Sequence, residues 1–217
     1  MTKKTIGLVL SNQPDFPKLC YSISNMGYIV RIVAPDEYRQ DIDMLIIYTS
    51  ALYYNSIPNG NFPVEDKTDT FIQNFIDQET INSYLVDKIP ILVLDQGVIY
   101  CRSLFGGYVS DITINTKKRI KVKIDESIVG ENIEEIISCP RQVLHGDAAY
   151  NFIEGEGYKL GKVSEKHSTI LGIQVSLNES LTFLDKVIAH YLPIEDQFDD
   201  NTEGESMCVM PAYVPRT

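Results

Sequence analysis

Positively charged residues are scarce in this sequence. It contains 19 lysine and arginine residues against 30 aspartate and glutamate residues, which gives the chain a net charge of -11. A protein this acidic repels phosphate backbones, so we expect no nucleic-acid partner. The one basic run, at residues 117–123, alternates with Ile120 and Val122. That alternation is typical of the solvent-facing side of a strand.

Cysteine and histidine are also few. The four cysteines lie far apart, form no CxxC pair and have no histidine nearby at the spacing of metal ligands: they are Cys20, Cys101, Cys139 and Cys208. The sequence therefore predicts neither a disulfide framework nor a metal site, and nothing in it calls for a cofactor. Such cysteines fit a reducing cytosol.

No long apolar run is visible. The segment 5–10 follows two lysines but is far shorter than the roughly 20 residues that a membrane-spanning helix needs. It is also too short for the apolar part of a signal peptide, and it is typical of a buried strand. We therefore expect a cytoplasmic protein that does not contact a membrane.

The apolar segments that are present alternate with helical patterns through the first half of the chain. We predict strands at 5–10, 28–33, 44–48 and 91–94, helices at 16–26 and 70–86, then short strands at 111–115, 119–125, 141–144, 158–163 and 169–175, and a helix at 180–191. This order predicts a doubly wound, flavodoxin-like α/β domain with a mostly parallel sheet, helices on both faces and an antiparallel extension in the second half. We assign residues 1–193 to this domain and 194–217 to an acidic linker with an apolar end.

The segment 90–107, PILVLDQGVIYCRSLFGG, is the most informative part of the chain. It has the form of a strand, a sharp turn and a helix. This arrangement lifts one side chain out at the carboxyl edge of a parallel sheet, where α/β proteins bind ligands. Asp95 is the residue in that position.

The same segment resembles the class I glutamine amidotransferases, in which the turn reads Pro-Ile-Leu-Gly-Ile-Cys-x-Gly-x-Gln and is followed by a helix and a Gly-Gly pair. The positions that match without a gap are Pro90, Ile91, Leu92, Gly97, Phe105, Gly106 and Gly107. In this resemblance the nucleophilic cysteine of the family falls on Asp95, and its substrate-contacting glutamine falls on Ile99.

Three further regions resemble the family in order and spacing, so that the likeness covers most of residues 5–192. Thr49, Ser50 and Ala51 stand where the family has a Gly-Gly-Pro oxyanion turn. The segment LHGD at 144–147 resembles the Ser-His-Gly-Asp of the guanylate synthetase branch. The segment GIQVSLNES at 172–180 resembles the Gly-Val-Gln-Phe-His-Pro-Glu-Ser that holds the family's catalytic histidine and glutamate.

Within that last segment Ser176 takes the place of the histidine, and the glutamate falls on Asn178 or Glu179. Hydrolysis of glutamine through a thioester requires a thiolate and a base that takes up its proton and returns it. Asp95 cannot form the thioester, and Ser176 cannot act as a base near neutral pH. The resemblance therefore implies the fold of the family while the sequence argues against glutaminase activity.

The candidate site follows from these positions. The residues equivalent to the family triad are Asp95, Ser176 and Glu179, and the candidate binding residues are Thr49, Ser50, Tyr53, Gln96, Ile99, His145 and Asp147. Tyr48, Tyr54 and Tyr100 also fall on or beside positions that line the family's active site, and aromatic side chains there suit either filling or ligand recognition.

Two functions are compatible with the sequence. The first is a pseudoenzyme that serves as a non-catalytic subunit of a synthase-type enzyme, as a homodimer, or as a binder of a small molecule or peptide. The second is a hydrolase or transferase of altered mechanism in which Asp95 works with Ser176, Glu179 or His145. Asp95 could also be a polar residue that only caps the following helix.

Overall fold

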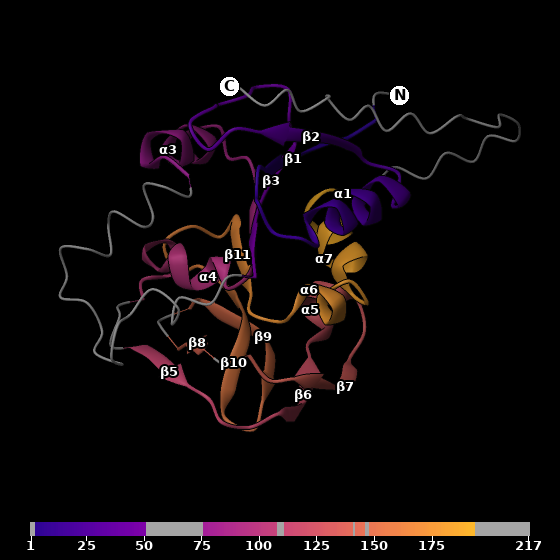
Figure 1. Cartoon of the computed structure of the whole chain (residues 1–217), viewed down its shortest axis with the longest axis vertical. Coiled ribbons are helices and arrows are strands. Elements are labelled where there is room, and N and C mark those ends of the chain that lie inside the picture. The colour runs from indigo at the N-terminus through magenta and orange to yellow at the C-terminus, as the bar shows by residue number, and fades with distance from the viewer. Residues whose placement is uncertain (1–2, 51–75, 108–110, 141, 146–147, 194–217) are drawn as a thin grey trace, which may run out of the picture.

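The computed structural model describes residues 3–50, 76–107, 111–140, 142–145 and 148–193 (Figure 1). In this part of the chain nine strands form one sheet in the order β2-β1-β3-β4-β11-β10-β9-β6-β7, and β5 and β8 form a separate pair. The strands are β1 Thr5–Val9, β2 Ile29–Val33, β3 Met44–Thr49, β4 Ile91–Asp95, β5 Ile112–Ile114, β6 Arg119–Ile124, β7 Ile133–Ser138, β8 Gln142–Leu144, β9 Tyr150–Gly155, β10 Tyr158–Val163 and β11 Ile170–Ile173. The helices are α1 Phe16–Asn25, α3 Gln78–Val86, α4 Gly97–Tyr100, α5 Glu126–Val129, α6 Leu177–Ser180 and α7 Leu184–Tyr191, with a 3-10 helix at Arg102–Phe105.

The sheet has a parallel half and an antiparallel half. The pairs β2/β1, β1/β3, β3/β4 and β4/β11 are parallel. From β11 onward, the pairs through β10, β9, β6 and β7 are antiparallel. Every residue of β1, β3, β4 and β11 is buried, as expected for parallel strands that are covered on both faces. This confirms the predicted doubly wound α/β fold with an antiparallel extension.

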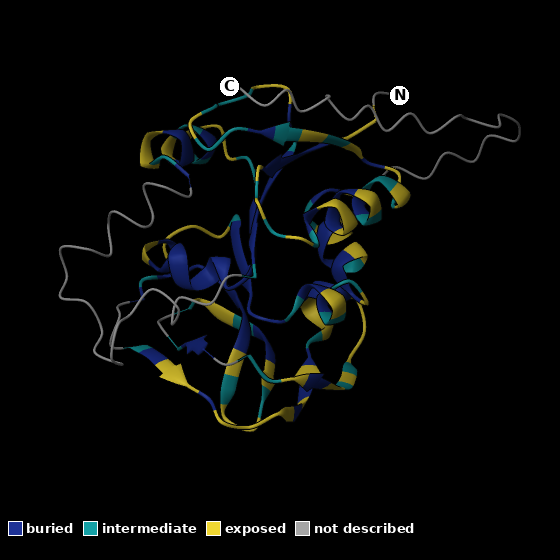
Figure 2. Cartoon of the chain, viewed as in Figure 1, coloured by how far each residue is buried: buried dark blue, intermediate teal, exposed yellow. Residues whose placement is uncertain are grey.

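Helices cover both faces of the sheet, with α3 and α4 on one side and α1, α5, α6 and α7 on the other (Figure 1). Alternate residues of one strand therefore enter two different cores. In β3, Ile46 and Tyr48 belong to the core beneath α1 and α7, whereas Leu45 and Ile47 belong to the core beneath α3 and α4. The short helix α4 is buried along its whole length (Figure 2).

Several predicted boundaries are wrong. The closing helix is not continuous over 180–191, because α6 ends at Ser180 and α7 begins only at Leu184. The helix expected at 70–86 begins at Gln78 in the described residues, after Asp77, whose side chain accepts the Thr80 N–H and so caps it; residues 70–75 lie outside them. The strands β7 and β9 were not predicted.

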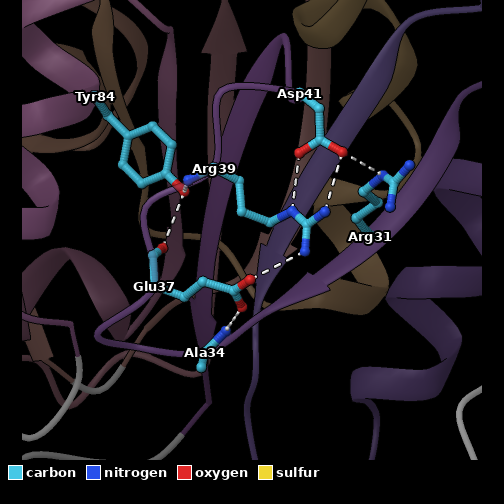
Figure 3. Close-up of polar contacts among 6 residues, drawn as sticks. All are labelled: Arg31, Ala34, Glu37, Arg39, Asp41 and Tyr84. Carbon is cyan, nitrogen blue, oxygen red and sulfur yellow. Dashed lines mark hydrogen bonds and ion pairs between the residues drawn. The ribbon is translucent and has the colours of Figure 1, made fainter.

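The crossover from β2 to β3 contains no helix over residues 34–43. Charged side chains hold it instead. The Asp41 carboxylate accepts from Arg39 Nε at 2.9 Å and pairs with Arg31 Nε at 3.1 Å, so that it lies between two guanidinium groups (Figure 3). The Tyr84 hydroxyl of α3 accepts the Arg39 N–H at 3.1 Å and donates to the Glu37 carbonyl at 3.2 Å.

The basic run leads into β6, and its last three charged residues lie on that strand. Arg119, Lys121 and Lys123 are exposed and alternate with buried apolar residues. Lys121 pairs with Glu134 of β7 at 2.5 Å, so part of the positive charge is neutralised by the neighbouring strand. The described helices are all too short or too polar to cross a bilayer.

Candidate functional site

The candidate residues gather where three parallel strands end. Thr49, the last residue of β3, is in register with Asp95, the last residue of β4. Leu94 is in register with Ile173 of β11. The chain that follows each strand therefore leaves at one edge of the sheet, and this brings Ser50, Asp95 and Ser176 to the same end of the molecule. In open α/β sheets this edge is where ligands bind.

Asp95 has a φ of 54°, in the left-handed region that most side chains avoid. Aspartate tolerates this region better than most residues because its short polar side chain bonds locally. Gly97 lets the chain pass close to β4, since a Cβ there would lie 3.1 Å from Val93 Cγ1. A strained residue at a sheet edge is a common feature of functional sites.

The Asp95 carboxylate lies in a nearly dry environment. The residue is only 8% exposed, and burial raises its pKa to about 7. The Gln96 side chain opposes this shift: its Nε2 donates to Asp95 Oδ1 at 3.4 Å. The negative charges of Asp15 and Glu179 raise the Asp95 pKa further. The Gln96 backbone N–H also donates to the Asp95 carboxylate and lowers its pKa, while Gln96, at the N-cap position of α4, makes no capping bond with its own side chain.

Asp15 reaches the site from the loop between β1 and α1. It occupies the N-cap position of α1, yet its side chain makes no capping hydrogen bond. Burial raises the pKa of the Tyr48 hydroxyl, and a side-chain hydrogen bond with Asp15 raises it further. Ser50 ties the same loop to β3, as its hydroxyl donates to Gln13 Oε1 at 2.7 Å.

Ser176 and Glu179 approach from the other end of the site, at the start of α6. The Ser176 hydroxyl donates to Glu179 Oε2 at 2.9 Å, and the Ser138 N–H donates to Glu179 Oε1 at 2.7 Å. The neighbouring Asn178 accepts from Lys18 of α1. The structure therefore places Glu179, and not Asn178, beside Ser176. We refer to Asp15, Tyr48, Asp95, Gln96 and Glu179 as the carboxylate site.

Other predicted residues lie in the core or apart from this site. Thr49 and Ile99 are fully buried, and Ile99 and Tyr100 belong to the core beneath α3 and α4. His145 lies near β5 and β8. Its ring Nε2 is 2.8 Å from Thr113 Oγ1, and its backbone N–H donates to the Asp111 carbonyl. Burial and the charge of Lys162 lower its pKa. None of these contacts joins His145 to Asp95. Tyr53, Tyr54 and Asp147 lie outside the described residues.

Cys101 and Cys139 are poor candidates for a nucleophile. Burial raises the pKa of the Cys101 thiol to about 12, as expected of a small core residue, and burial also raises that of Cys139. In the parts of the chain with described positions, no group of three or more His, Cys, Asp or Glu could hold a metal ion. A cavity of about 410 Å³ lies on the antiparallel half instead, between Lys123, Phe152 and Lys159.

The sequence did not single out Asp15, Gln13 or the buried Lys162. A signal for Asp15 existed, because it follows the first strand and precedes the first helix, and loops in that position line the ligand edge of α/β sheets. The pattern Ser-x-x-Glu at 176–179 was also informative, since it is a frequent helix-start signature.

Comparison with solved structures shows the class to which this fold belongs. PurLQS from Thermotoga maritima superposes with a TM-score of 0.60 at 13% identity, over 88% of this chain and 98% of that one. A candidate GMP synthase subunit from Thermoplasma acidophilum gives 0.59 at 13% identity, over 88% and 93%. A glutamine amidotransferase from Thermotoga maritima gives 0.52 at 10% identity, over 88% and 83%. The fold is therefore that of glutamine amidotransferase-like structures. No protein-family model and no curated protein matches the sequence.

Proposed function

We propose that this protein is a pseudoenzyme with an amidotransferase-like fold, in which the carboxylate site binds a ligand and does not hydrolyse glutamine. The observation that carries the proposal is that a carboxylate, that of Asp95, stands at the sharp turn that ends β4. Hydrolysis through a thioester needs a thiolate at that point. A carboxylate there cannot form the thioester.

The surroundings of Asp95 support the same conclusion. The Ser176 hydroxyl, at the position where the resemblance expects a base, donates its hydrogen bond to Glu179. A hydroxyl does not accept a proton near neutral pH, so it cannot replace an imidazole. The groups whose charges act on Asp95 are the carboxylates Asp15 and Glu179. The described residues thus supply neither the nucleophile nor the base of the amide hydrolysis.

We further propose a protein partner, either a synthase-type enzyme or a second copy of this chain. One of the similar structures is named as a synthase subunit, and the likeness extends over most of both chains. An interface can persist after the chemistry is lost, because it depends on surface shape and not on the catalytic side chains. The proposed division into a domain at 1–193 and a tail at 194–217 leaves the tail as a further candidate for that contact.

A second candidate function is supported by the raised pKa of Asp95. A carboxyl group with a pKa of about 7 can both donate and accept a proton near neutral pH. In this alternative the protein is a hydrolase or transferase in which Asp95 acts as the acid or base on a substrate other than glutamine.

Two measurements test these proposals. Ammonia release from glutamine is compared for the wild type and Asp95→Asn, and we expect no release above background from either. In parallel, amino acids, nucleotides and short peptides are screened for a rise in melting temperature with the wild type, Asp95→Asn and the control Glu165→Gln. Glu165 is exposed in the loop that precedes β11, at the opposite edge of the sheet.

A ligand that stabilises the wild type and Glu165→Gln but not Asp95→Asn would support the binding function. Conversion of that ligand by the wild type, lost in Asp95→Asn, would favour the second candidate. Glutamine hydrolysis that disappears in Asp95→Asn would overturn the pseudoenzyme proposal.

A further inference from the structure

The cavity on the antiparallel half of the sheet has a volume of about 410 Å³. It is lined by residues of three adjacent strands, β6, β9 and β10, and by the turn that joins β9 to β10 (Figure 1). No residue of the carboxylate site lines it. Its volume is near the lower end of the range for ligand pockets, roughly 300 to 1,000 Å³, so it suits a small ligand.

The backbone beside this cavity departs from regular pairing. The ladder between β9 and β10 has register shifts between Lys159 and Gly161 and between Gly161 and Lys162. At Gly155 the chain passes so close to β6 that a Cβ would lie 2.1 Å from the Lys121 carbonyl oxygen. Such irregularities bend a strand and change the direction of its side chains, and they are frequent beside functional sites.

The turn between β9 and β10 is held in a strained conformation. Glu156 has a φ of 50° and Gly157 a φ of 87°, both in the left-handed region. The Glu156 carboxylate accepts from Lys117 Nζ at 2.6 Å and from the Lys121 N–H at 3.2 Å, and these bonds fix the turn against β6. A strained residue persists only where its surroundings hold it, and such residues cluster at ligand sites.

Three charged side chains that line the cavity have no partner in the part of the chain that the structure describes. Lys123, Glu154 and Lys159 form no hydrogen bond or ion pair there, and all three are exposed. The charge of Lys123 acts on neighbouring carboxylates only at longer range. Asp125 also lines the cavity, but its carboxylate already accepts the Ser127 N–H at 2.8 Å.

These three side chains lie side by side across the sheet. Glu154 of β9 is in register with Lys123 of β6 and with Lys159 of β10. Residues in register point to the same face of a sheet, and neighbouring strands are roughly 4.8 Å apart. The charges therefore follow the order positive, negative, positive, with one strand spacing between unlike charges.

A ligand that satisfies this set needs two unlike charges close together. A carboxylate accepts from the lysine ammonium groups, and an ammonium group donates to the Glu154 carboxylate. A simple anion would lie beside Glu154 and a simple cation beside the two lysines, so that each would meet a like charge. A zwitterion meets an unlike charge at both of its ends.

We propose that this cavity binds a free α-amino acid, with its carboxylate on Lys123 or Lys159 and its ammonium group on Glu154. The two charged groups of an amino acid are attached to one carbon atom, and this short separation fits side chains on neighbouring strands. The inference goes beyond the proposed function, because it concerns residues that are not part of the carboxylate site.

The test uses the full chain, titrated with glycine at pH 7 and constant ionic strength while backbone amide resonances are recorded. The comparison ligands are betaine, a zwitterion whose nitrogen carries no hydrogen, acetate, which lacks the ammonium group, and methylammonium, which lacks the carboxylate. We expect saturable shifts with glycine, centred on residues 123–125 and 151–159, and much weaker responses to the other three.

Substitutions of the lining charges should act in different directions. Glu154→Gln should weaken glycine binding by about three- to fivefold, the effect of losing one partly exposed ion pair. The same variant should bind acetate more tightly than the wild type does, because the negative charge beside the anion is gone. Lys159→Gln should weaken the binding of both ligands. Lys118→Gln is the control, since Lys118 is exposed but does not line the cavity.

Equal responses to glycine and acetate would overturn the proposal, because the carboxylate alone would then explain them. Equal responses to glycine and betaine would also overturn it, since no N–H donor would be needed. Unchanged glycine affinity in Glu154→Gln, or no saturable response to glycine, would have the same meaning. Shifts centred on residues 95–97 would assign the amino acid to the carboxylate site and refute the cavity as its binding site.

Discussion

The Ser176 hydroxyl donates a 2.9 Å hydrogen bond to Glu179 Oε2, and this pair holds a carboxylate close enough to Asp95 to raise the pKa of Asp95. In the resemblance to the amidotransferases these two positions belong to a base and its orienting acid. In this structure Ser176 holds the Glu179 carboxylate in place, and the charge of Glu179 acts on Asp95. The same Glu179 also accepts from the Ser138 N–H at 2.7 Å, so its position is set by β7 as well as by α6.

This arrangement predicts how the pKa of Asp95 responds to substitution. We expect Asp95 to titrate near 7, Asp15→Asn to lower that pKa, and Glu179→Gln to lower it by a smaller amount. It should stay above the ordinary value in both variants, because burial is the main cause of the shift. The measurement is a carboxyl carbon NMR titration of the wild type and the two variants, with Glu165→Gln as the control that leaves it unchanged. An Asp95 that titrates near pH 4 would contradict the burial of this side chain.

The raised pKa also predicts a pH-dependent stability. Between pH 4 and 7 folded Asp95 keeps a proton that the unfolded chain has lost, so the free energy of unfolding should fall as the pH rises and level off above about 7. The full effect is up to roughly 4 kcal/mol. Asp95→Asn should therefore be more stable than the wild type at pH 8 and lose this slope. Urea denaturation of the wild type and Asp95→Asn at pH 5 and pH 8 measures the difference in stability and its pH dependence. Equal pH dependence in the two proteins would contradict the prediction.

Lys162 is a buried charge in the interior of the antiparallel half. It is fully buried, its Nζ donates to the Leu144 carbonyl, and burial lowers its pKa to about 8. Keeping this lysine charged below pH 8 costs up to about 3 kcal/mol, and losing the bond to Leu144 costs about 1 kcal/mol. We expect Lys162→Met to stabilise the protein by about 1 to 2 kcal/mol at pH 7.

The wild type should gain stability between pH 8 and 10.5, because folded Lys162 releases its proton before the unfolded chain does. Lys162→Met should lack this gain. Lys166→Met, at an exposed position, serves as the control and should change stability by less than about 0.5 kcal/mol. The measurement is urea denaturation of the three proteins at pH 7 and at pH 10. If Lys162→Met lowered the free energy of unfolding at both pH values, the buried lysine would not destabilise the folded state.

Tyr84 anchors the helix-free crossover between β2 and β3. Its hydroxyl bonds both the Arg39 N–H and the Glu37 carbonyl, and Tyr84→Phe leaves these two backbone groups without a partner (Figure 3). We expect a loss of about 1 to 2 kcal/mol in stability and faster hydrogen exchange at the Arg39 amide. Tyr21→Phe is the matched control, because Tyr21 is 65% exposed. An unchanged exchange rate at Arg39 would show that the hydroxyl does not hold the crossover.

The strands with both faces buried are among those that the sequence located correctly. In β3 and β4 every residue lies in one of the two cores, and such continuous apolar runs are visible without any knowledge of neighbours. The turn at Asp95 was also visible, because a strand followed by Gly97 and a second apolar segment has few other conformations. By contrast, β7 has one buried residue, Ile137, and this edge strand shows no periodicity strong enough to predict.

The candidate site was only partly predictable for a related reason. Asp95, Ser176 and Glu179 could be found because they occupy recognisable positions in motifs. Asp15, which the sequence did not single out, joins the site through its interaction with Tyr48, from a segment more than 30 residues away in the chain. His145 was expected beside Asp95, but β8 pairs with β5 and places its ring against Thr113.

Local sequence predicts the buried parallel strands and the sharp turn at Asp95, because each depends on residues that are adjacent in the chain. Tertiary contacts were needed to bring Asp15 and Glu179 close enough to Asp95 for their charges to raise its pKa. The reason is that parallel pairing brings the carboxyl ends of separate strands to a single edge, and the burial that raises the pKa of Asp95 comes from the segments packed around that edge.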